Sequence, residues 1–482
     1  MALEAPGVGR SDENLHQLGL GTSVIRAIIS EIVAFDFRII VEGTIGNLFG
    51  ISRGTFLTSI FLGLLGVLWY LIPNLPLFAF AWIVGTMPIW LPIVAISGGW
   101  KAWVWYVQSS YLSKRVPMLL EMKMPREMVK SPRGMEVALS QLWIDSGQTT
   151  FFHRKWLGQV YPIFSFEIAS FGGDVHFYIW IWKEWRPVVE SAIYAQYPEV
   201  EIEEVEDYAS KYVYDPSKEM VYATDHRLEP RNDAYPLKTY VEFELDKETE
   251  EEYVVDPLAQ VVERMSALGP TEQMWLQIVI TMNNFGSVVR RKPGGWFWET
   301  ESRYTSIINE EIDNVRKEIT GDPSQPEERW KQYARVQLFH INELVKAMGR
   351  NLSKHPFHVG IRGVFISDPA NFISRGWNNL RWIWAPMGDP MHSNQLRPRR
   401  WHTPYDYPYQ DLWDLRWNLT ARRFFDCYRR RAHFYPPYVL PDNLMSTEVL
   451  ATLWHPLSSA IKSPGLERIP AKKAEPPHNL PK

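Results

Sequence analysis

The chain has 482 residues, and its 51 lysines and arginines nearly balance 55 aspartates and glutamates, giving a formal net charge of -4. This balance excludes a global attraction to nucleic acid, so any such contact would need a local basic patch. The single cysteine, Cys427, excludes an internal disulfide and a thiolate metal cluster, which suits a reducing cytoplasm. The length predicts more than one structural module.

The first 54 residues are predicted to form a disordered terminus and an amphipathic helix before the membrane-spanning region. Residues 1–22 are polar and are expected to be disordered, with no signal peptide. Residues 23–54 carry isoleucines at helical spacing, interrupted by charges such as Arg26, Glu31 and Arg38. These charges favour an amphipathic helix that lies at the membrane surface or packs against a neighbouring subunit.

The stretch from Thr55 to Ile96 contains no Asp, Glu, Lys, Arg or His. Each half approaches the roughly 20 apolar residues that cross a bilayer, and Pro73 and Pro76 bracket the break between them. We therefore expect a transmembrane hairpin over residues 55–96. Because Pro88 and Pro92 interrupt the second half, a re-entrant or in-plane second segment is the alternative.

Basic residues flank the predicted hairpin on both sides, and the connecting turn has none, which predicts that both termini face the cytoplasm. Residues 97–118 are expected to form a juxtamembrane stem. Amphipathic side chains typical of the membrane–water interface lie both within the predicted hairpin and in this stem. Some of the tryptophans among them could instead pack between helices. The predicted interface anchors are Trp69, Trp100, Lys101, Trp103 and Trp105.

Residues 119–235 are predicted to form a first cytoplasmic α+β domain. A strand in MLLEMKMPREM precedes a helix from Ser131 to Leu142, and FSFEIAS and DVHFYIWIW form a hairpin around Gly172 and Gly173. A helix from Trp185 to Tyr197 and a strand in VEIEEVEDY complete the pattern. This order predicts half or more of a ferredoxin-like α+β sandwich.

Residues 236–462 are predicted to repeat this unit as a second α+β domain. The expected strands are LKTYVEFEL, EQMWLQIVITM and PFHVGIRGVFIS, with a helix capped by Asp256 and a helical insertion at about 283–348. A loop is expected from Asp389 to Gln410, followed by helices from Asp411 to Arg431 and from Ser446 to Leu453. Residues 463–482 have the composition of a linker.

The sequence carries no catalytic, cofactor or metal signature. It has no G-x-x-x-x-G-K-[ST] phosphate-binding loop, so the chain is not expected to be an ATPase or another enzyme. His355 and His358 flank a proline without further ligands, which favours structural roles. The acidic run at the VEIEEVEDY strand is expected to form a solvated face, and Cys427 to be a packing residue.

One strongly basic stretch, ARRFFDCYRRRAHFYPP, interleaves arginines with aromatic residues. Such interleaving can bind phosphates and stack on bases, which makes nucleic acid one possible partner. Arginines near a helix end also pair with acidic protein surfaces or lipid headgroups. The candidate contact residues are Arg422, Arg423, Arg429, Arg430 and Arg431.

Several blocks carry a resemblance to a known group, namely PMLLEMKMPRE, FSFEIASFGGDVHFYIW, AQYPEVEIEEVEDY, DPLAQVVERM, CYRRRAHFYPP and STEVLATLWHP. Over about residues 117–482 the chain resembles uncharacterised membrane proteins of uncultured bacteria related to the N-terminal, non-ATPase part of type IV secretion and conjugation motor proteins. In longer relatives a similar terminal segment leads into a coupling-type ATPase domain, whereas this sequence stops at Lys482.

The resemblance implies a non-catalytic scaffold subunit in the bacterial cytoplasmic membrane that docks a separately encoded P-loop ATPase. It implies no cofactor, and it suggests membrane lipid and further copies of the chain as partners. A membrane-tethered nucleic-acid-binding protein that uses residues 422–431 is the alternative hypothesis.

Overall fold

The computed structural model describes residues 53–72, 74–126, 130–144, 150–247, 255–282, 287–291, 298–320, 339–370, 372, 374–389, 391, 393–402, 411–458 and 465–469. The predicted disordered N-terminus and nearly all of the predicted amphipathic helix over 23–54 lie outside these residues. The chain divides into two units, residues 1–102 with 404–414, and residues 103–403 with 415–482.

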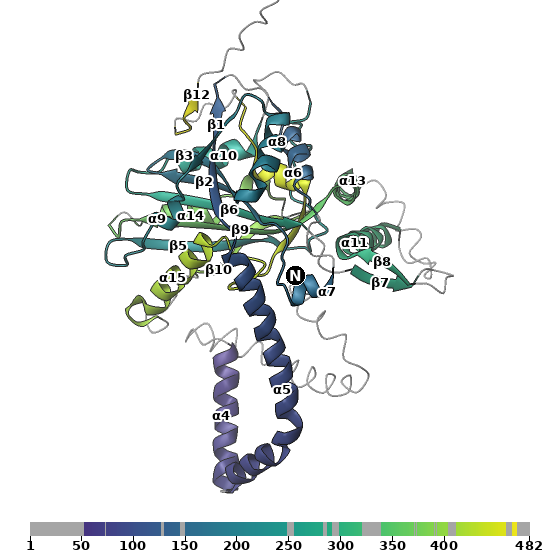
Figure 1. Cartoon of the computed structure of the whole chain (residues 1–482), viewed down its shortest axis with the longest axis vertical. Coiled ribbons are helices and arrows are strands. Elements are labelled where there is room, and N and C mark those ends of the chain that lie inside the picture. Colours follow the sequence, from purple (N-terminus) through teal and green to yellow (C-terminus); the bar gives the residue numbers. More distant parts are fainter. Residues whose placement is uncertain are drawn as a thin grey trace, which may run out of the picture. The chain divides into compact units, whose positions relative to one another are not determined.

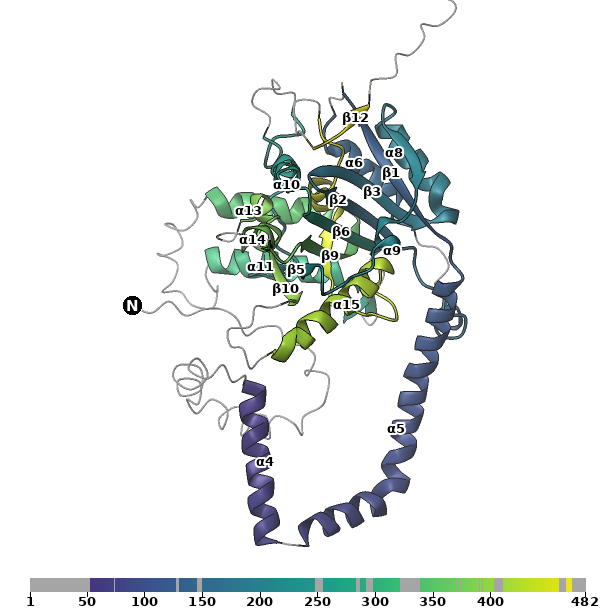
Figure 2. The same ribbon diagram turned by 90° about the vertical axis from the view of Figure 1, so that its left-hand side faces the viewer.

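The predicted hairpin region forms two helices, α4 (Arg53–Leu71) and α5 (Leu75–Ser113), with a break at residues 72–74, close to the two prolines that predicted it (Figure 1). Helix α5 continues through Pro88 and Pro92 and is curved in Figure 2. It also includes most of the predicted stem. The stem is therefore helical as far as Ser113, and β1 starts at Pro117.

Within the described residues, one helical segment is long and apolar enough to cross a membrane by length and composition: Leu77–Ser113 of α5. In α4, the apolar segment whose side chains are described, Phe61–Leu71, is shorter than a membrane span. The large apolar side chains of both segments, among them Leu62, Phe78 and Ile89, are exposed.

The second unit, residues 103–403 with 415–482, is called the folded unit below. It is a mixed α and β structure built on one large, predominantly antiparallel sheet. Its first half contains β1 (Pro117–Pro125), α6 (Arg133–Gln141), β2 (Phe164–Phe171), β3 (Asp174–Trp182), α8 (Arg186–Gln196) and β4 (Glu201–Val205). In space these strands follow the order β4-β1-β3-β2, with every neighbouring pair antiparallel.

The second half contains β5 (Met220–Glu229), α10 (Pro257–Ser266), β6 (Gln273–Met282), β9 (Pro356–Ser367), α14 (Ser374–Arg381) and β10 (Gln395–Trp401). Its spatial order is β10-β5-β9-β6, again antiparallel throughout. Both halves therefore place their strands in the order fourth, first, third, second. Strands β2 and β6, the second strand of each half, pair with each other and join the halves.

The remaining elements extend these two halves. Between β6 and β9 lie the hairpin β7 (Ser287–Arg291) and β8 (Trp298–Ser302), α11 (Arg303–Thr320) and α13 (Phe339–Leu352). Short helices are α7 (Phe151–Lys155), η2 (Lys183–Trp185), α9 (Tyr208–Lys211), η5 (Ala385–Met387) and η7 (Leu412–Asp414). After β10 follow α15 (Leu415–Arg429), β11 (Asn443–Ser446), α16 (Thr447–Leu453) and β12 (Arg468–Ile469).

The sheet is covered on both faces. Alternate strand residues such as Leu120, Phe166 and Ile179 pack with α6, α8, α10 and α16 in one core. Their neighbours on the opposite face, such as Ala169 and Trp275, pack with α15 and α9 in another. In Figure 2, α15 lies beside β5 and β10, the strands that it contacts.

Three predicted local features are confirmed. The Gly172–Gly173 turn has positive φ angles of 62° and 100°, which glycine adopts without strain. The side chain of Asp256 accepts a hydrogen bond from Leu258 N at 2.9 Å, and that of Ser446 accepts one from Val449 N at 3.5 Å. Both residues cap the helices where the sequence predicted them.

Two assignments in the second half are wrong. The segment LKTYVEFEL over 237–245 forms no strand: it is irregular at 237–239 and forms consecutive turns from residue 240. The first strand of this half is instead β5, Met220–Glu229. The predicted loop from Asp389 to Gln410 contains the edge strand β10, while residues 403–410 lie outside the described residues. The second half therefore begins before the boundary predicted at residue 236.

The insertion and the tail also differ from their predictions. The insertion is not wholly helical, because it contains the hairpin β7–β8. The long helix predicted from Glu327 to Met348 is described only from Phe339, as part of α13. In the predicted linker, β12 pairs in parallel with the end of β1, and Gly465 O accepts a hydrogen bond from Val175 N at 2.7 Å.

Candidate functional site

The predicted basic segment is held against the sheet by its aromatic residues. Phe424 and Tyr428 are fully buried, and Phe425 is nearly so. Their rings pack against Trp275 of β6, with centroids 6.1 Å from Phe425 and 5.8 Å from Tyr428. Aromatic rings in a core cannot stack on bases, so these three rings are not available for the base stacking that a nucleic-acid interface would use.

The five predicted arginines separate into two groups. Arg422, Arg423, Arg429 and Arg430 are exposed, as a contact surface requires. Arg431 differs from the prediction because its side chain is 0% exposed. The helix ends at Arg429, and Arg431 has a φ of 50°, so the chain turns inward and carries this guanidinium beneath the helix.

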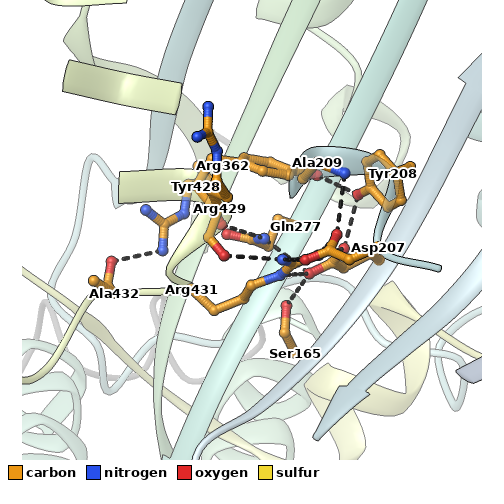
Figure 3. A network of polar contacts seen from close by, with 11 residues as sticks. Ser165, Asp207, Tyr208, Ala209, Gln277, Arg362, Tyr428, Arg429, Arg431 and Ala432 are labelled. Atoms are coloured by element: carbon orange, nitrogen blue, oxygen red, sulfur yellow. Dashed lines mark hydrogen bonds and ion pairs between the residues drawn. The ribbon is translucent and has the colours of Figure 1, made fainter. Parts of the chain in front are cut away.

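All five N–H donors of the Arg431 guanidinium are used (Figure 3). Nε and Nη2 donate to the two carboxylate oxygens of Glu167 at 2.9 and 3.1 Å. Nη1 and Nη2 donate to Asp207 at 2.5 and 2.9 Å, and Nη1 also donates to Arg429 O at 2.9 Å. Burial would lower the pKa of Arg431, but the two carboxylates outweigh it and hold that pKa well above its usual value.

Glu167 is the second centre of the network. One carboxylate oxygen accepts hydrogen bonds from Ser165 and Gln277, both at 2.8 Å. The other accepts from the Tyr208 hydroxyl at 2.7 Å, and Tyr208 lies 2.8 Å from the Tyr428 hydroxyl. Burial, followed by the negative charge of Glu167, raises the pKa of both tyrosines well above its ordinary value, so both keep their protons. Glu167 on β2 is paired with Gln277 on β6, the two strands at which the halves of the sheet meet. The network therefore spans this boundary between the halves, which we call the seam.

The seam belongs to a longer row of polar residues that crosses the sheet in register. Each member is directly opposite the next on the neighbouring strand, so the row needs the strand pairing to become visible. The row runs through Glu121, Tyr178, Glu167, Gln277, Arg362 and Asp225, from β1 to β5. The sequence signal that could have revealed its centre is a single charged or amide residue inside an otherwise uncharged strand, as in FSFEIAS, MWLQIVIT and GIRGVFIS.

The second half contributes a buried arginine of its own. Arg362 donates to Cys427 Sγ at 2.7 Å and to Ala432 O at 2.8 Å, which ties β9 to the end of α15. Burial raises the pKa of the Cys427 thiol, so the predicted packing role of this buried residue agrees with its surroundings. Burial also raises the pKa of Asp225, whose carboxylate accepts a hydrogen bond from Trp401 Nε1 at 2.8 Å.

Other predicted polar groups have separate structural partners. His355 stacks on Trp143 with centroids 4.9 Å apart, and His358 pairs with Asp442. In the acidic run, Glu203 and Glu204 form exposed ion pairs with lysine and arginine, which confirms a solvated face there. Asp207 differs, because it caps α9 and pairs with Arg431. Among the described residues, no group of three His, Cys, Asp or Glu side chains could hold a metal ion.

The predicted interface anchors lie on α4 and α5. Trp69, Trp105 and Lys101 are exposed, and Trp100 and Trp103 are only partly covered. Trp103 has a structural partner as well, because its Nε1 donates to Lys155 O at 3.1 Å and its ring contacts Trp156 at 5.5 Å. This contact joins α5 to the segment of α7 and the residues that follow it.

Residues 151–157 form an exposed apolar surface beside the C-terminal part of α5, which we call the α7 segment. Four large side chains in this short segment are about half exposed: Phe151 57%, Phe152 56%, Trp156 48% and Leu157 47%. The segment is fixed at its end by Gly158, which has a φ of 68° and approaches Val107 so closely that a Cβ would lie 2.3 Å from Val107 O. Any larger residue would force the segment away from α5.

No protein-family model matches the chain, and no curated protein matches it. The arrangement of the charged and apolar groups is that of a structural support. The charged groups of the Arg431 network are satisfied inside the protein, while the exposed arginines and the α7 segment face outward. Such an arrangement is suited to holding surfaces in fixed positions.

Proposed function

We propose that this chain is a membrane-anchored, non-catalytic scaffold subunit of a type IV secretion or conjugation-like machine that translocates DNA or protein, and that it docks a separately encoded P-loop ATPase. The observation that carries the proposal is the continuity of α5, which begins in an uncharged apolar segment and ends three residues before β1. The resemblance described above supplies the kind of machine.

We further propose that the two halves of the sheet are two ferredoxin-like units. Their common strand order, with one helix between the first and second strands and another between the third and fourth, supports this assignment. The pairing of β2 with β6 then makes one continuous platform from two units. The Arg431 network would keep this platform rigid at its seam, which is what a docking scaffold needs.

For the membrane, the proposal is a hairpin of α4 and α5 in the bacterial cytoplasmic membrane with both termini in the cytoplasm. The length and apolar surface of α5 and the basic residues on both sides of the hairpin support it. The α7 segment adds independent support, because its exposed aromatic side chains lie beside Trp103, one of the predicted interface anchors. Phe151, Phe152 and Trp156, with Arg154 and Lys155 between them, have the composition of an interfacial anchor.

The proposal favours a protein partner over nucleic acid for the exposed arginines. Arg422, Arg423, Arg429 and Arg430 can still pair with phosphates or carboxylates, but four of the neighbouring rings that would stack on bases, those of Phe424, Phe425, Tyr428 and Tyr435, are buried. An acidic surface of an ATPase subunit requires only the charges. Further copies of the chain are also proposed partners, since motor ATPases of this kind are ring-shaped assemblies in the family that the sequence resembles.

The α7 segment provides a test of membrane contact in the full-length protein. A cysteine introduced as Phe152→Cys can be labelled with an environment-sensitive fluorophore, because the native Cys427 is buried. In proteoliposomes we expect the emission to shift to shorter wavelength and to be quenched by lipids brominated near the headgroup, since the side chain would sit among headgroups.

The matched control for this experiment is Val137→Cys on α6, which is also exposed but lies on the helix layer of the sheet. Its label should have the same emission in proteoliposomes and in detergent solution, because residue 137 would be in contact with water in both. Equal emission and equal quenching at residues 137 and 152 would count against the proposed membrane contact of the α7 segment.

A further inference from the structure

A cavity of about 430 Å³ lies in the folded unit between the last turns of α5 and the basic segment. Its walls include Trp105, Ser109 and Arg115 from α5 and the residues after it, Trp182 from β3, and Arg429 and Arg430 from the basic segment. The volume is within the range of sites that hold small molecules or headgroups. The lining combines aromatic rings with cationic groups.

Among the residues that the structure describes, two buried donors line this cavity without a hydrogen-bond partner: Ser109 Oγ and Arg115 Nε. The rest of the Arg115 guanidinium is held in place, because Nη1 lies 2.6 and 2.7 Å from the two Glu184 carboxylate oxygens and the group lies over the Trp182 ring at 5.6 Å. Buried polar groups in proteins are normally hydrogen-bonded. A fixed donor left over on an oriented guanidinium therefore indicates a ligand that accepts hydrogen bonds.

The charge at the cavity is positive. Arg429 and Arg430 are exposed at its edge; Arg429 donates to Tyr212 O at 3.3 Å, and Arg430 pairs with Asp426 at 2.9 Å. The one carboxylate in the lining, Asp207, is already neutralised by Arg431, as Figure 3 shows. An anion with several acceptor oxygens is the ligand class that this set of donors recognises.

We propose that the cavity binds the phosphodiester headgroup of an anionic phospholipid. This inference rests on the proposed membrane anchoring. Trp105 stands two residues after Trp103, which contacts the α7 segment, so the cavity begins at the level of the helix where the proposed membrane interface lies. Trp180, Trp182 and Tyr435 provide apolar walls for the glycerol and the first methylene groups, which free phosphate would leave uncovered.

The test uses full-length protein purified in detergent and stripped of lipid. Phosphatidylglycerol and phosphatidylcholine are titrated separately, and bound lipid is counted by native mass spectrometry. We expect phosphatidylglycerol to bind and the variant Arg429→Glu to weaken its binding by about tenfold, since each interfacial arginine contributes on the order of one kcal/mol to anionic lipid binding. Arg422→Glu makes the same charge change on the same helix outside the cavity lining, and should alter binding less than about twofold.

A second variant tests the cavity rather than the surface charge. Ser109→Leu removes a lining hydroxyl and adds bulk, so it should also weaken phosphatidylglycerol binding while leaving the circular dichroism spectrum unchanged. Equal binding of both lipids, or equal losses in Arg429→Glu and Arg422→Glu, would overturn the proposal. Displacement of the lipid by millimolar inorganic phosphate or ATP would assign the site to a soluble phosphate instead and would also overturn it.

Failure of this inference can be separated from failure of the proposed function. A chain that stays in the membrane after alkaline carbonate extraction but shows no preference for phosphatidylglycerol contradicts only the headgroup site. A chain that is extracted by carbonate contradicts the membrane anchoring itself, and with it the basis of the headgroup site.

Discussion

Replacing Arg431 with leucine is expected to lower the free energy of unfolding by about 3–5 kcal/mol, the usual cost of removing one partner from a buried ion pair. The substitution leaves Glu167, which is fully buried, and the partly buried Asp207 without their cation. It also removes five hydrogen bonds at the seam between the two halves of the sheet. Urea denaturation in detergent, followed by tryptophan fluorescence, measures the loss.

The neighbouring residue supplies the control for this prediction. Arg430 pairs with Asp426 at 2.9 Å, but the two side chains are 57% and 39% exposed, so Arg430→Leu should cost less than about 1 kcal/mol. Adding Glu167→Gln to Arg431→Leu should recover part of the loss, because the second change removes the unpaired buried charge. Similar losses for Arg430→Leu and Arg431→Leu would contradict the description of the Arg431 network.

Acidification from pH 7 to pH 4 is expected to destabilise the folded unit strongly. Burial lowers the pKa of His226 and His402 to about 4 and that of His433 to about 3, against an ordinary value of 6.5. In the unfolded chain these histidines become protonated as the pH falls below about 6.5, whereas in the folded chain they stay neutral until about pH 4. Because the unfolded state binds more protons in this range, the free energy of unfolding decreases as the pH falls. At pH 5 the loss is on the order of 2 kcal/mol for each histidine with a pKa near 4.

His402 shows why the neutral form is required. Its Nδ1 accepts a hydrogen bond from Ala223 N at 2.9 Å, and its Nε2 lies 3.0 Å from Trp417 O, a carbonyl to which it must donate. A proton on Nδ1 would remove the acceptor that Ala223 N uses. His402→Asn should therefore reduce the dependence of the thermal midpoint on pH between 6.5 and 4, whatever it costs at pH 7.

The opposite result for His402→Asn would be a midpoint that falls with pH as steeply as that of the unmodified chain. The paired carboxylates cannot account for this window. Burial alone would raise the pKa of both carboxyl groups. The hydrogen bond and charge of His176 outweigh burial at Glu121, and burial at Asp442 is outweighed by the hydrogen bond and charge of His358, so the pKa of each carboxyl lies below its ordinary value. Their contributions to stability are consequently lost at lower pH than those of the histidines.

Local patterns predicted the elements whose chemistry is self-contained. The glycine turn before Asp174, the capping by Asp256 and the apolar strands β2, β3, β6 and β9 all depend on neighbouring residues, and each formed where it was expected. By contrast, the β5 sequence MVYATDHRLE carries Asp225, His226 and Arg227 in succession, and its apolar run is only the four residues MVYA. Asp225 is acceptable in a strand because Trp401 of the neighbouring strand β10 donates a hydrogen bond to its carboxylate, and His226 Nε2 lies 3.3 Å from Leu380 O.

The two wrong assignments have identifiable physical causes. In LKTYVEFEL, alternating residues suggested a strand, but Tyr240 and Leu245 are buried in the core five residues apart while Thr239 O accepts bonds from Glu242 N and Phe243 N. Tertiary packing thus overrode the local preference. The β10 sequence QLRPRRW, with its proline and arginines, has the composition that edge strands use to avoid further pairing, which made it resemble a loop.

The candidate site was only half predictable for a related reason. In the sequence, the arginines at positions 429–431 are equivalent members of one basic run. The backbone turn at Arg431 separates it from the others and brings it to Glu167, 264 positions earlier in the chain. No local pattern carries information about that distance, and the polar row across the sheet depends in the same way on strand register.

The proposed docking of a P-loop ATPase to this chain at a membrane is tested most directly by purification from native membranes. The full-length chain, tagged and extracted in mild detergent after in-cell cross-linking, should retain a P-loop ATPase as a stoichiometric partner identified by mass spectrometry. Reversing the exposed charges with Arg422→Glu and Arg423→Glu should reduce that recovery without releasing the chain from the membrane. Recovery of the chain from membranes with no P-loop ATPase cross-linked to it would contradict the account.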